Sequence, residues 1–290
     1  MSFPVIDAHQ HIWDPNKAKY DWLGPDFAEL NRVFEIDELL PQLEKLGINY
    51  TVQVQSADNH EDTGLMRDCA SRYSEVAAIV GFAPLVNPEE TAITIESWAK
   101  DDLMVGVRNL IHTKPDPKWL LRADVNESLA LLANAGYTFD VVSVLPEQLA
   151  AVSEISNSHP ELRMVIDHMS KPPIGLSDDR EWRKLMIEAA QNPNVFAKIS
   201  GLYSATSDPA AWTTEQIRPY FDFALETFGP QRLMYGGDWP VALIAGGYER
   251  VWNGLLPLFN ALSSADREQI LGRTAAEFYK ITPTRLGMSA

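Results

Sequence analysis

The sequence of 290 residues is poor in cysteine, in cationic residues and in long apolar segments. Its single cysteine, Cys69, cannot form an intramolecular disulfide, and it lies in a helix-like stretch, Gly64 to Tyr73, that lacks a reactive-cysteine signature. No apolar run is long enough to span a bilayer, and the first strand-like segment begins too close to Met1 to leave room for a signal peptide. We therefore expect a cytoplasmic protein in a reducing compartment.

The charge balance excludes one class of partner. Lysine and arginine number 24 against 40 aspartate and glutamate residues, so the formal net charge is −16. Nucleic-acid binding depends on clustered lysine and arginine that displace counterions from phosphates, and the sequence has no such cluster. The same argument disfavours an anionic membrane surface. A small-molecule substrate is the partner that we expect, and apolar helices such as Val251–Leu262 suit either the core or the interface of a homo-oligomer.

Strand-like and helix-like segments alternate along the whole chain. The apolar, β-rich segments are Val5–Ile12, Tyr50–Ser56, Val76–Leu85, Met104–Ile111, Thr138–Val144, Arg163–Ser170, Val195–Tyr203 and Arg232–Pro240. The amphipathic stretches of helical period are Ile36–Lys45, Thr63–Arg72, Ala92–Lys100, Asn126–Ala135, Pro146–Ser156, Glu181–Gln191 and Ile217–Phe228, followed by a last pair, Tyr248–Leu262 and Ser264–Tyr279.

Eight such alternations predict an α/β fold of the TIM (β/α)8 barrel type, with one domain over residues 1–290. The near-continuous valine and isoleucine runs are typical of parallel strands that are buried on both faces. An open doubly wound sheet is the alternative, but no Gly-x-Gly-x-x-Gly fingerprint follows any strand. An aromatic loop at about residues 13–34 is longer than most barrel connections, and we expect it to form a lid.

Two histidines one residue apart, His9 and His11, end the first strand-like segment. Successive strand side chains point to opposite faces, so these two share a face, with their Cα atoms about 6–7 Å apart. Two imidazoles at a strand end can hold a metal ion or polarise a carbonyl oxygen. The alternative is a chance pair of polar residues on an edge strand.

Two further polar residues end strands of the predicted barrel. His168 ends the sixth strand, and Asp238 ends the eighth, which barrel closure places beside the first. Three histidines and one carboxylate would then meet at one barrel mouth, where they suit a single zinc-like ion or a metal-free site that polarises a carbonyl. Asp238 follows two glycines and suits a general base, with a turn or helix-capping role as the alternative.

At these residues the chain resembles the amidohydrolase superfamily, and within it the lactone hydrolases that include sugar-acid lactonases and 2-pyrone-4,6-dicarboxylate lactonase. The resemblance covers essentially the whole chain. Its carriers are Asp7-Ala8-His9-Gln10-His11, Tyr20-Asp21-Trp22, Asp167-His168-Met169-Ser170-Lys171-Pro172, Lys198-Ile199-Ser200-Gly201 and Gly237-Asp238-Trp239-Pro240.

The resemblance implies hydrolysis of a cyclic ester, with Asp238 as the base toward water. It assigns the catalytic and metal-holding roles to one set of residues, His9, His11, His168 and Asp238. The fourth strand, Val105–Asn109, lacks the bridging lysine or glutamate of two-metal members, and the fifth, Phe139–Ser143, lacks their histidine, so we do not expect a binuclear centre. The resemblance implies lactonases with one divalent ion and others with none. We expect one zinc ion, with metal-independent catalysis left open.

Polar and aromatic residues near the strand ends are the candidate substrate contacts. They are Arg108, His112, Gln55, Trp22, Lys171, Lys198 and Trp239. A cation near the scissile bond would stabilise the oxyanion that develops as water adds. Lys198 equally suits an ion pair inside the barrel, Gln55 a structural hydrogen bond, and the tryptophans ordinary packing.

The charge of the substrate is the only one of its properties that the sequence indicates. Arg108 is the only arginine plainly placed at one of these strand ends, whereas a dicarboxylate would need several. We therefore expect a neutral sugar-acid lactone. The alternatives are a 2-pyrone-4,6-dicarboxylate-type or muconolactone-type lactonase, a metal-dependent aromatic-acid decarboxylase of the same superfamily, and a non-catalytic sugar-acid binding protein.

Overall fold

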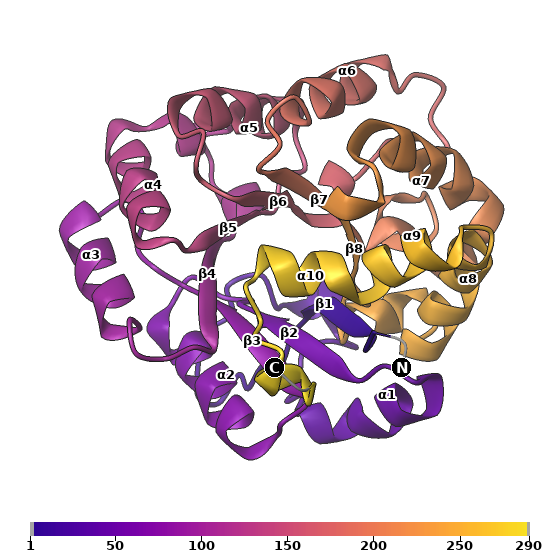
Figure 1. Cartoon of the computed structure of the whole chain (residues 1–290), viewed down its shortest axis with the longest axis horizontal. Helices are drawn as coiled ribbons and strands as arrows, with labels where there is room; N and C mark the ends of the chain where they lie inside the picture. Colours follow the sequence, from indigo (N-terminus) through magenta and orange to yellow (C-terminus); the bar gives the residue numbers. More distant parts are fainter. Residues whose placement is uncertain (1–2, 289–290) are drawn as a thin grey trace.

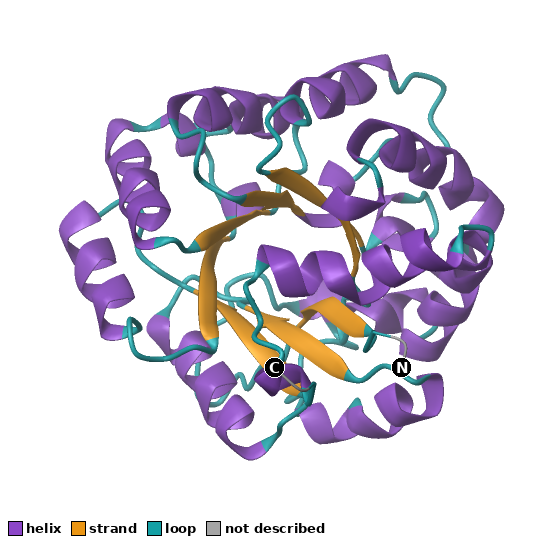
Figure 2. Cartoon of the chain, viewed as in Figure 1, coloured by secondary structure: helices purple, strands orange, loops and turns teal. Residues whose placement is uncertain are grey.

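Eight parallel strands form a barrel with helices around it in the computed structural model, which describes residues 3–288 (Figures 1 and 2). Each strand pairs with the next one along the chain. The strands are β1 (Ile6–Gln10), β2 (Tyr50–Val54), β3 (Val76–Gly81), β4 (Met104–Asn109), β5 (Thr138–Val141), β6 (Met164–Ile166), β7 (Val195–Ile199) and β8 (Leu233–Tyr235).

The barrel closes at the carboxyl end of β8. The amide of Asp238 donates to the carbonyl of His9 at 2.8 Å, and the amide of His11 donates to the carbonyl of Trp239 at 2.7 Å. Gln10 and Trp239 form a parallel bridge at the same place. The prediction of a TIM (β/α)8 barrel is therefore confirmed. The hydrogen bonds that close it involve His9, His11 and Asp238, which were predicted as site residues.

Helices connect the strands and pack around the barrel (Figure 2). They are α1 (Leu40–Leu46), α2 (His60–Arg72), α3 (Pro88–Ser97), α4 (Ala123–Ala135), α5 (Pro146–Ser158), α6 (Arg180–Ala189), α7 (Thr214–Phe228), α8 (Tyr248–Asn260), α9 (Ser264–Glu268) and α10 (Thr274–Phe278). A π-helical turn over Gln269–Arg273 joins the last two. Within residues 3–288 no helix is both long and apolar enough to cross a bilayer.

Side-chain caps explain two helix starts that differ from the predicted ones. The side chain of Asn59 accepts from the amide of Asp62, so α2 begins at His60 rather than at Thr63. Asn87 caps α3 in the same way, so α3 begins at Pro88 rather than at Ala92.

The last three strands are shorter than predicted, because the chain turns out of the sheet before the polar residues. β6 ends at Ile166, and the four residues from His168 to Lys171 all adopt left-handed backbone conformations, with φ between 46° and 56°. β7 ends at Ile199 and β8 at Tyr235, so Ser200 and Asp238 also lie on the turns that follow, whereas Lys198 lies within β7. His168 and Asp238 thus occupy loops anchored on short strands, whereas His9 lies on β1 itself.

Helix α10 lies across one end of the barrel in the view of Figure 1. Tyr279, directly after this helix, donates its hydroxyl to Oδ2 of Asp140 on β5 at 2.7 Å. The apolar residues of α10 pack with those of β1 and β2 in one buried cluster. The C-terminal segment therefore covers the barrel interior from the end opposite to the strand-end residues.

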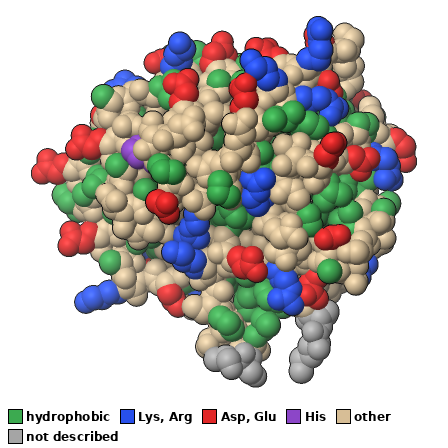
Figure 3. All heavy atoms as spheres, turned by 45° about the horizontal axis from the view of Figure 1, so that its top comes forward, with side chains coloured by type: hydrophobic (Ala, Val, Ile, Leu, Met, Phe, Trp, Pro, Cys, Tyr) green, Lys and Arg blue, Asp and Glu red, His purple; other side chains and the backbone are tan. Residues whose placement is uncertain are grey.

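The outer surface mixes charges of both signs. On the face drawn in Figure 3, acidic and basic side chains are interspersed among neutral ones.

The long loop after β1 is ordered by its own contacts. Trp13 and Phe34 exchange backbone hydrogen bonds at 3.2 and 2.9 Å and close the loop at its base. The hydroxyl of Tyr20 donates to Asp62 on α2 at 2.9 Å, and the indole of Trp22 donates to the carbonyl of Ser56 at 2.7 Å. The predicted lid segment is therefore held against the loop after β2.

Candidate active site

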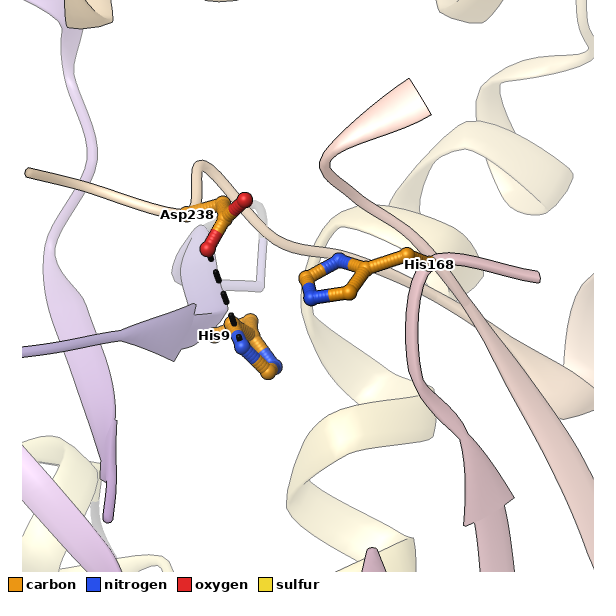
Figure 4. Close-up of side chains that lie close together, drawn as sticks. All are labelled: His9, His168 and Asp238. Carbon is orange, nitrogen blue, oxygen red and sulfur yellow. Dashed lines mark ion pairs between the residues drawn. The ribbon is translucent and has the colours of Figure 1, made fainter. Parts of the chain in front are cut away.

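Three buried side chains from distant parts of the chain meet at the carboxyl end of the barrel. His9 comes from β1, His168 from the turn after β6 and Asp238 from the turn after β8 (Figure 4). One nitrogen or oxygen of each lies within 4.8 Å of those of the other two. Nε2 of His9 is 3.8 Å from Oδ1 of Asp238, and the two imidazole rings lie edge to face with centroids 4.6 Å apart. The structure thus brings together three of the four predicted residues around one point.

His11, the fourth predicted residue, lies beside this group rather than within it. Its Nδ1–H donates to the carbonyl of Val54 at 2.6 Å, and its Nε2 lies 3.5 Å from Oδ1 of Asp238. Of the four residues predicted as metal ligands, His9, His168 and Asp238 have ligand atoms that all lie within 4.8 Å of one another, and the ligand role of His11 stays a prediction. It faces the same carboxylate oxygen as His9 from another side.

Glycine at position 201 makes this close approach possible. Gly201 has φ of 57°, and a Cβ there would lie 2.5 Å from Nδ1 of His168 and 2.8 Å from Oδ2 of Asp238. Gly237 has a similar role one layer below, because a Cβ would lie 2.1 Å from the ring of Tyr248. Both glycines therefore leave room for functional side chains.

Asp238 is held as a charged base. Burial alone would raise its pKa, but His168, His11 and His9 together hold the pKa well below its usual range. The hydroxyl of Tyr203 donates to Oδ2 of Asp238 at 3.0 Å, which leaves Oδ1 facing the histidines. The carboxylate is thus ionised, oriented and directed toward the point where the histidines meet.

His168 and His9 beside it are neutral in the folded protein. Burial lowers the pKa of His168 to about 4, and it lowers that of His9 well below the usual value. Nδ1 of His168 lies 2.9 Å from the hydroxyl of Ser200. A neutral imidazole has one donor and one acceptor nitrogen, so the contacts of each ring decide which nitrogen carries the proton.

A charged cluster fills the barrel interior beneath His9. The ammonium of Lys198 lies 3.0 Å from Nδ1 of His9, 2.6 Å from Oδ2 of Asp140 and 3.1 Å from Oδ1 of Asp167. The guanidinium of Arg108 lies 3.0 Å from the other oxygen of Asp167. Two cations and two carboxylates therefore balance one another under the site.

A cavity of about 170 Å³ opens above these residues. Its lining residues are His11, Trp22, Phe27, Ser56, Arg108, Leu110, His112, Val142, Val144, His168, Lys171, Ser204, Asp238, Val241 and Ile244. Four of the predicted substrate contacts are among them, namely Trp22, Arg108, His112 and Lys171. The strand that was predicted to continue to Ile111 ends at Asn109, and His112 lies on the 3-10 turn Ile111–Thr113 that follows it.

Three other predicted substrate contacts have structural positions instead. Lys198 is fully buried below His9, because its side chain points into the barrel toward Asp140. Gln55 is also fully buried and donates to the carbonyl of Arg108 at 2.8 Å. Trp239 is 2% exposed and packs edge to face on Phe34. The ion-pair, hydrogen-bond and packing interpretations therefore describe these residues.

Several residues of the site had no role assigned from the sequence. Ser200 and Gly201 directly follow β7, so the sequence could have placed them at a strand end. It does not show their contacts with His168. Tyr203 lies on a 3-10 turn, Leu202–Ala205, and only the folded backbone brings it to Asp238.

The three converging side chains fit a metal ion of the zinc type. Nε2 of His9 is buried and has no hydrogen-bond partner among the described residues. Imidazole nitrogens and a carboxylate oxygen are the ligands that zinc prefers in catalytic sites, where a further position stays open. The donor set therefore suits one ion held by His9, His168 and Asp238.

Comparisons with known proteins agree with this geometry. The family model described as amidohydrolase matches residues 6–281. The chain is 33% identical over 280 residues to a protein of Burkholderia ambifaria named L-fucono-1,5-lactonase, with 95% of each chain covered. It is 31% identical to a protein of the same name from Burkholderia multivorans, with 95% of this chain and 96% of that one covered.

A solved structure is similar over nearly the whole length. It is the crystal structure of an amidohydrolase from Burkholderia multivorans with bound zinc, at 30% sequence identity and a TM-score of 0.88. The match covers 96% of this chain and 100% of that one. The barrel, the strand-end histidines and aspartate, and a family match that spans nearly all of the sequence lead to one conclusion: the chain belongs to the amidohydrolase family.

Proposed function

We propose that the protein is a lactonase that hydrolyses a sugar-acid lactone to the hydroxy acid. The observation that carries the proposal is the ionised carboxylate of Asp238, which faces His9 and His11 at the floor of a cavity. The names of the relatives from the two Burkholderia species support it. A base beside two imidazoles is what the addition of water to a carbonyl needs.

In this proposal Asp238 accepts a proton from water as the water oxygen bonds to the carbonyl carbon of the lactone. The bond between that carbon and the ring oxygen then breaks, and the ring oxygen takes a proton back from Asp238. Water and lactone are consumed, and one hydroxy acid forms. Its carboxyl group releases a proton at neutral pH, so turnover can be followed by acid release.

Neutral and cationic donors stand where the carbonyl oxygen gains negative charge. His168 lines the cavity beside Asp238, and Arg108 and Lys171 line it nearby. Donors that are fixed before the reaction begins stabilise an oxyanion more than mobile water does. In the metal-free site we assign this role to His168, with Arg108 and Lys171 contacting the rest of the ring.

The cavity favours a single-ring substrate of mixed polarity. Its volume of about 170 Å³ lies below the roughly 300–1,000 Å³ that is typical of drug-sized sites. Val142, Val144, Val241 and Ile244 give it apolar walls, whereas Ser204 and the basic residues give it polar ones. A deoxysugar lactone such as L-fuconolactone suits these walls, because it presents a methyl group as well as hydroxyls.

One divalent ion, with zinc preferred, is part of the proposal. His9, His168 and Asp238 would hold it. When bound, such an ion would supply Lewis-acid polarisation of the lactone carbonyl. The residues described above still bind the ring, orient the water and move its proton.

A lactone panel tests the proposed function. Purified protein is mixed with L-fucono-, L-rhamnono- and galactonolactones, and proton release is followed with a pH indicator, with and without a chelator. We expect rapid opening of at least one deoxysugar lactone. Turnover of 2-pyrone-4,6-dicarboxylate alone, or carbon dioxide release from an aromatic acid without lactone opening, would contradict the proposal. Tight binding of sugar acids without turnover would contradict it as well.

A further inference from the structure

A second, larger space lies beside the site cavity at the mouth of the barrel. The site cavity is the space of about 170 Å³ above His168 and Asp238. The second space, which we call the side groove, measures about 950 Å³ and is lined by residues from the segments 15–22, 57–61 and 110–115. These segments follow β1, β2 and β4, so both spaces open on the face of the barrel that carries the site.

Two side chains stand between the site cavity and the side groove. Among the described residues, Trp22 and Leu110 are the ones that line both spaces. The chain itself crosses the same boundary between consecutive residues, because Ser56 lines the site cavity and Ala57 lines the side groove. The loop after β4 crosses it directly after His112. Trp22 and Leu110 therefore form a wall between two neighbouring spaces.

Trp22 is held in this wall from three sides. Its indole N–H donates to the carbonyl of Ser56 at 2.7 Å. Its ring packs edge to face on Trp13 and on Phe27, with centroids 5.2 and 5.8 Å apart. Trp13 is buried at the base of the loop, and Phe27 lines the site cavity. One hydrogen bond and two ring contacts leave the indole little freedom to swing aside.

A buried carboxylate fixes both Trp22 and its hydrogen-bond partner. Oδ1 of Asp62 accepts from the hydroxyl of Tyr20 at 2.9 Å, two residues before Trp22. The same carboxylate accepts from the amide of Ser56 at 2.9 Å and from its hydroxyl at 3.1 Å. Asp62 is fully buried at the start of α2. The loop after β1 and the loop after β2 are thus attached to one point.

Leu110, the other half of the wall, is attached to the loop after β2 as well. Its amide donates to Oδ1 of Asp58 at 2.9 Å, and the side chain of Gln55 donates to the same oxygen at 3.2 Å. The ammonium of Lys114 donates to Oδ2 of Asp58 at 2.6 Å. Both wall residues are therefore held by hydrogen bonds to neighbouring residues of one loop.

The side groove is polar and balanced in charge. Three lysines and three acidic residues line it, namely Lys17, Lys19, Lys114, Asp21, Asp58 and Glu61. Lys19 pairs with Asp21 at 2.5 Å, and Lys114 pairs with Asp58. The side-chain amides of Asn16 and Asn59 add neutral donors and acceptors. Such a surface suits a neutral group rich in hydroxyls, such as a sugar ring.

We propose that Trp22 is a specificity-determining residue, which with Leu110 closes the site cavity toward the side groove and limits the substrate to a lactone with one ring. A second sugar ring attached to the lactone meets the indole before it reaches the polar groups of the side groove. Without the indole the two spaces join, and a lactone that carries a glycosyl group can enter. The wall follows from the contacts, whereas a lactone as the substrate rests on the proposed function.

The test compares lactones that share one ring. D-glucono-1,5-lactone has no substituent, and its 4-O- and 6-O-galactosyl derivatives carry a second sugar. Acid release above the spontaneous rate gives kcat/KM for each with the parent protein and with Trp22→Ala. We expect the parent to favour the single-ring lactone. In Trp22→Ala we expect the ratio of two-ring to single-ring kcat/KM to rise at least about tenfold for one derivative or both.

A binding measurement tests the wall without turnover. Calorimetric affinities for gluconate and for its two galactosyl derivatives give a ratio of the same kind, and we expect it to rise in Trp22→Ala as well. If no lactone is opened, the proposed function fails, and the affinities alone decide on the wall. A Trp22→Ala protein that neither opens nor binds a two-ring compound better than the parent does overturns the inference.

Two further variants control the experiment. Leu110→Ala removes the other half of the wall, so it should shift the ratio in the same direction and replaces Trp22→Ala if that protein does not fold. Trp119→Ala is the matched control, because Trp119 is a half-buried tryptophan after β4 that is not among the residues lining either space. We expect the parent ratio in Trp119→Ala. An equal rise in this control, or a parent that opens two-ring lactones as readily as the single-ring one, overturns the inference.

Discussion

The hydroxyl of Tyr203 lies 3.0 Å from Oδ2 of Asp238, the carboxylate oxygen that does not face His9 and His11. Both side chains are buried. A hydrogen bond to a charged group contributes about 1.5–3 kcal/mol. Tyr203 therefore fixes the direction of the base, although it is not among the residues that line the cavity.

Tyr203→Phe should lower kcat for the lactone by about 10- to 100-fold, the rate equivalent of one such hydrogen bond. The measurement is steady-state acid release. Tyr220→Phe is a matched control, since the hydroxyl of Tyr220 donates to the carbonyl of Pro173 on an outer turn at 3.0 Å. Equal rates for the Tyr203 variant and the parent protein would show that Asp238 is oriented without this hydroxyl.

Gly201→Ala should damage the site through a direct clash. The added methyl group would lie within 2.8 Å of both His168 and Asp238, and φ of 57° adds about 1–2 kcal/mol of backbone strain. We expect kcat to fall at least tenfold, with a lower Tm. Gly175→Ala has φ of 84° but no atom within 4 Å of the new Cβ, so it separates strain from clash. If both variants lose activity equally, the clash is not the cause.

Asp7 should make stability depend on pH. Burial raises its pKa to about 6, although Gly237, Tyr248 and His9 all donate to its carboxylate. The folded pKa lies above that of the unfolded chain, so Asp7 contributes stability at low pH that is lost as the pH rises through 6. Relative to Asp7→Asn, the parent protein should lose about 1.4 kcal/mol of unfolding free energy between pH 5 and pH 8. Urea titrations at the two pH values measure this difference, and a constant difference would contradict the raised pKa.

The barrel and the position of its site could be predicted from the sequence because both follow from local rules. Alternation of side chains along a strand puts His9 and His11 on one face, and the eightfold strand count makes the last strand the neighbour of the first. The ends of β6 and β8 then place His168 and Asp238 near them. Sequence periodicity and chain order were enough for this step.

The contacts that orient these side chains could not be predicted, because they depend on the backbone after each strand. The left-handed turn from His168 to Lys171 and the turn that presents Tyr203 have no periodic signal. Lys198 could have pointed into the cavity or into the barrel, and only the packed interior, with Asp140 and Tyr279 from distant segments, decides between them. For the same reason, the sequence predicted that these strands extend further than they do.

Asp238→Asn tests most directly whether this carboxylate activates water. The amide has nearly the same shape but cannot take a proton, and general-base catalysis contributes about 10²- to 10⁴-fold to a rate. We expect acid release from L-fuconolactone to fall by at least about 10²-fold, while circular dichroism stays unchanged and Asp178→Asn, a substitution at a surface ion pair with Arg180, retains full activity. An Asp238→Asn protein that opens the lactone at the rate of the parent would contradict the role of Asp238 as the base.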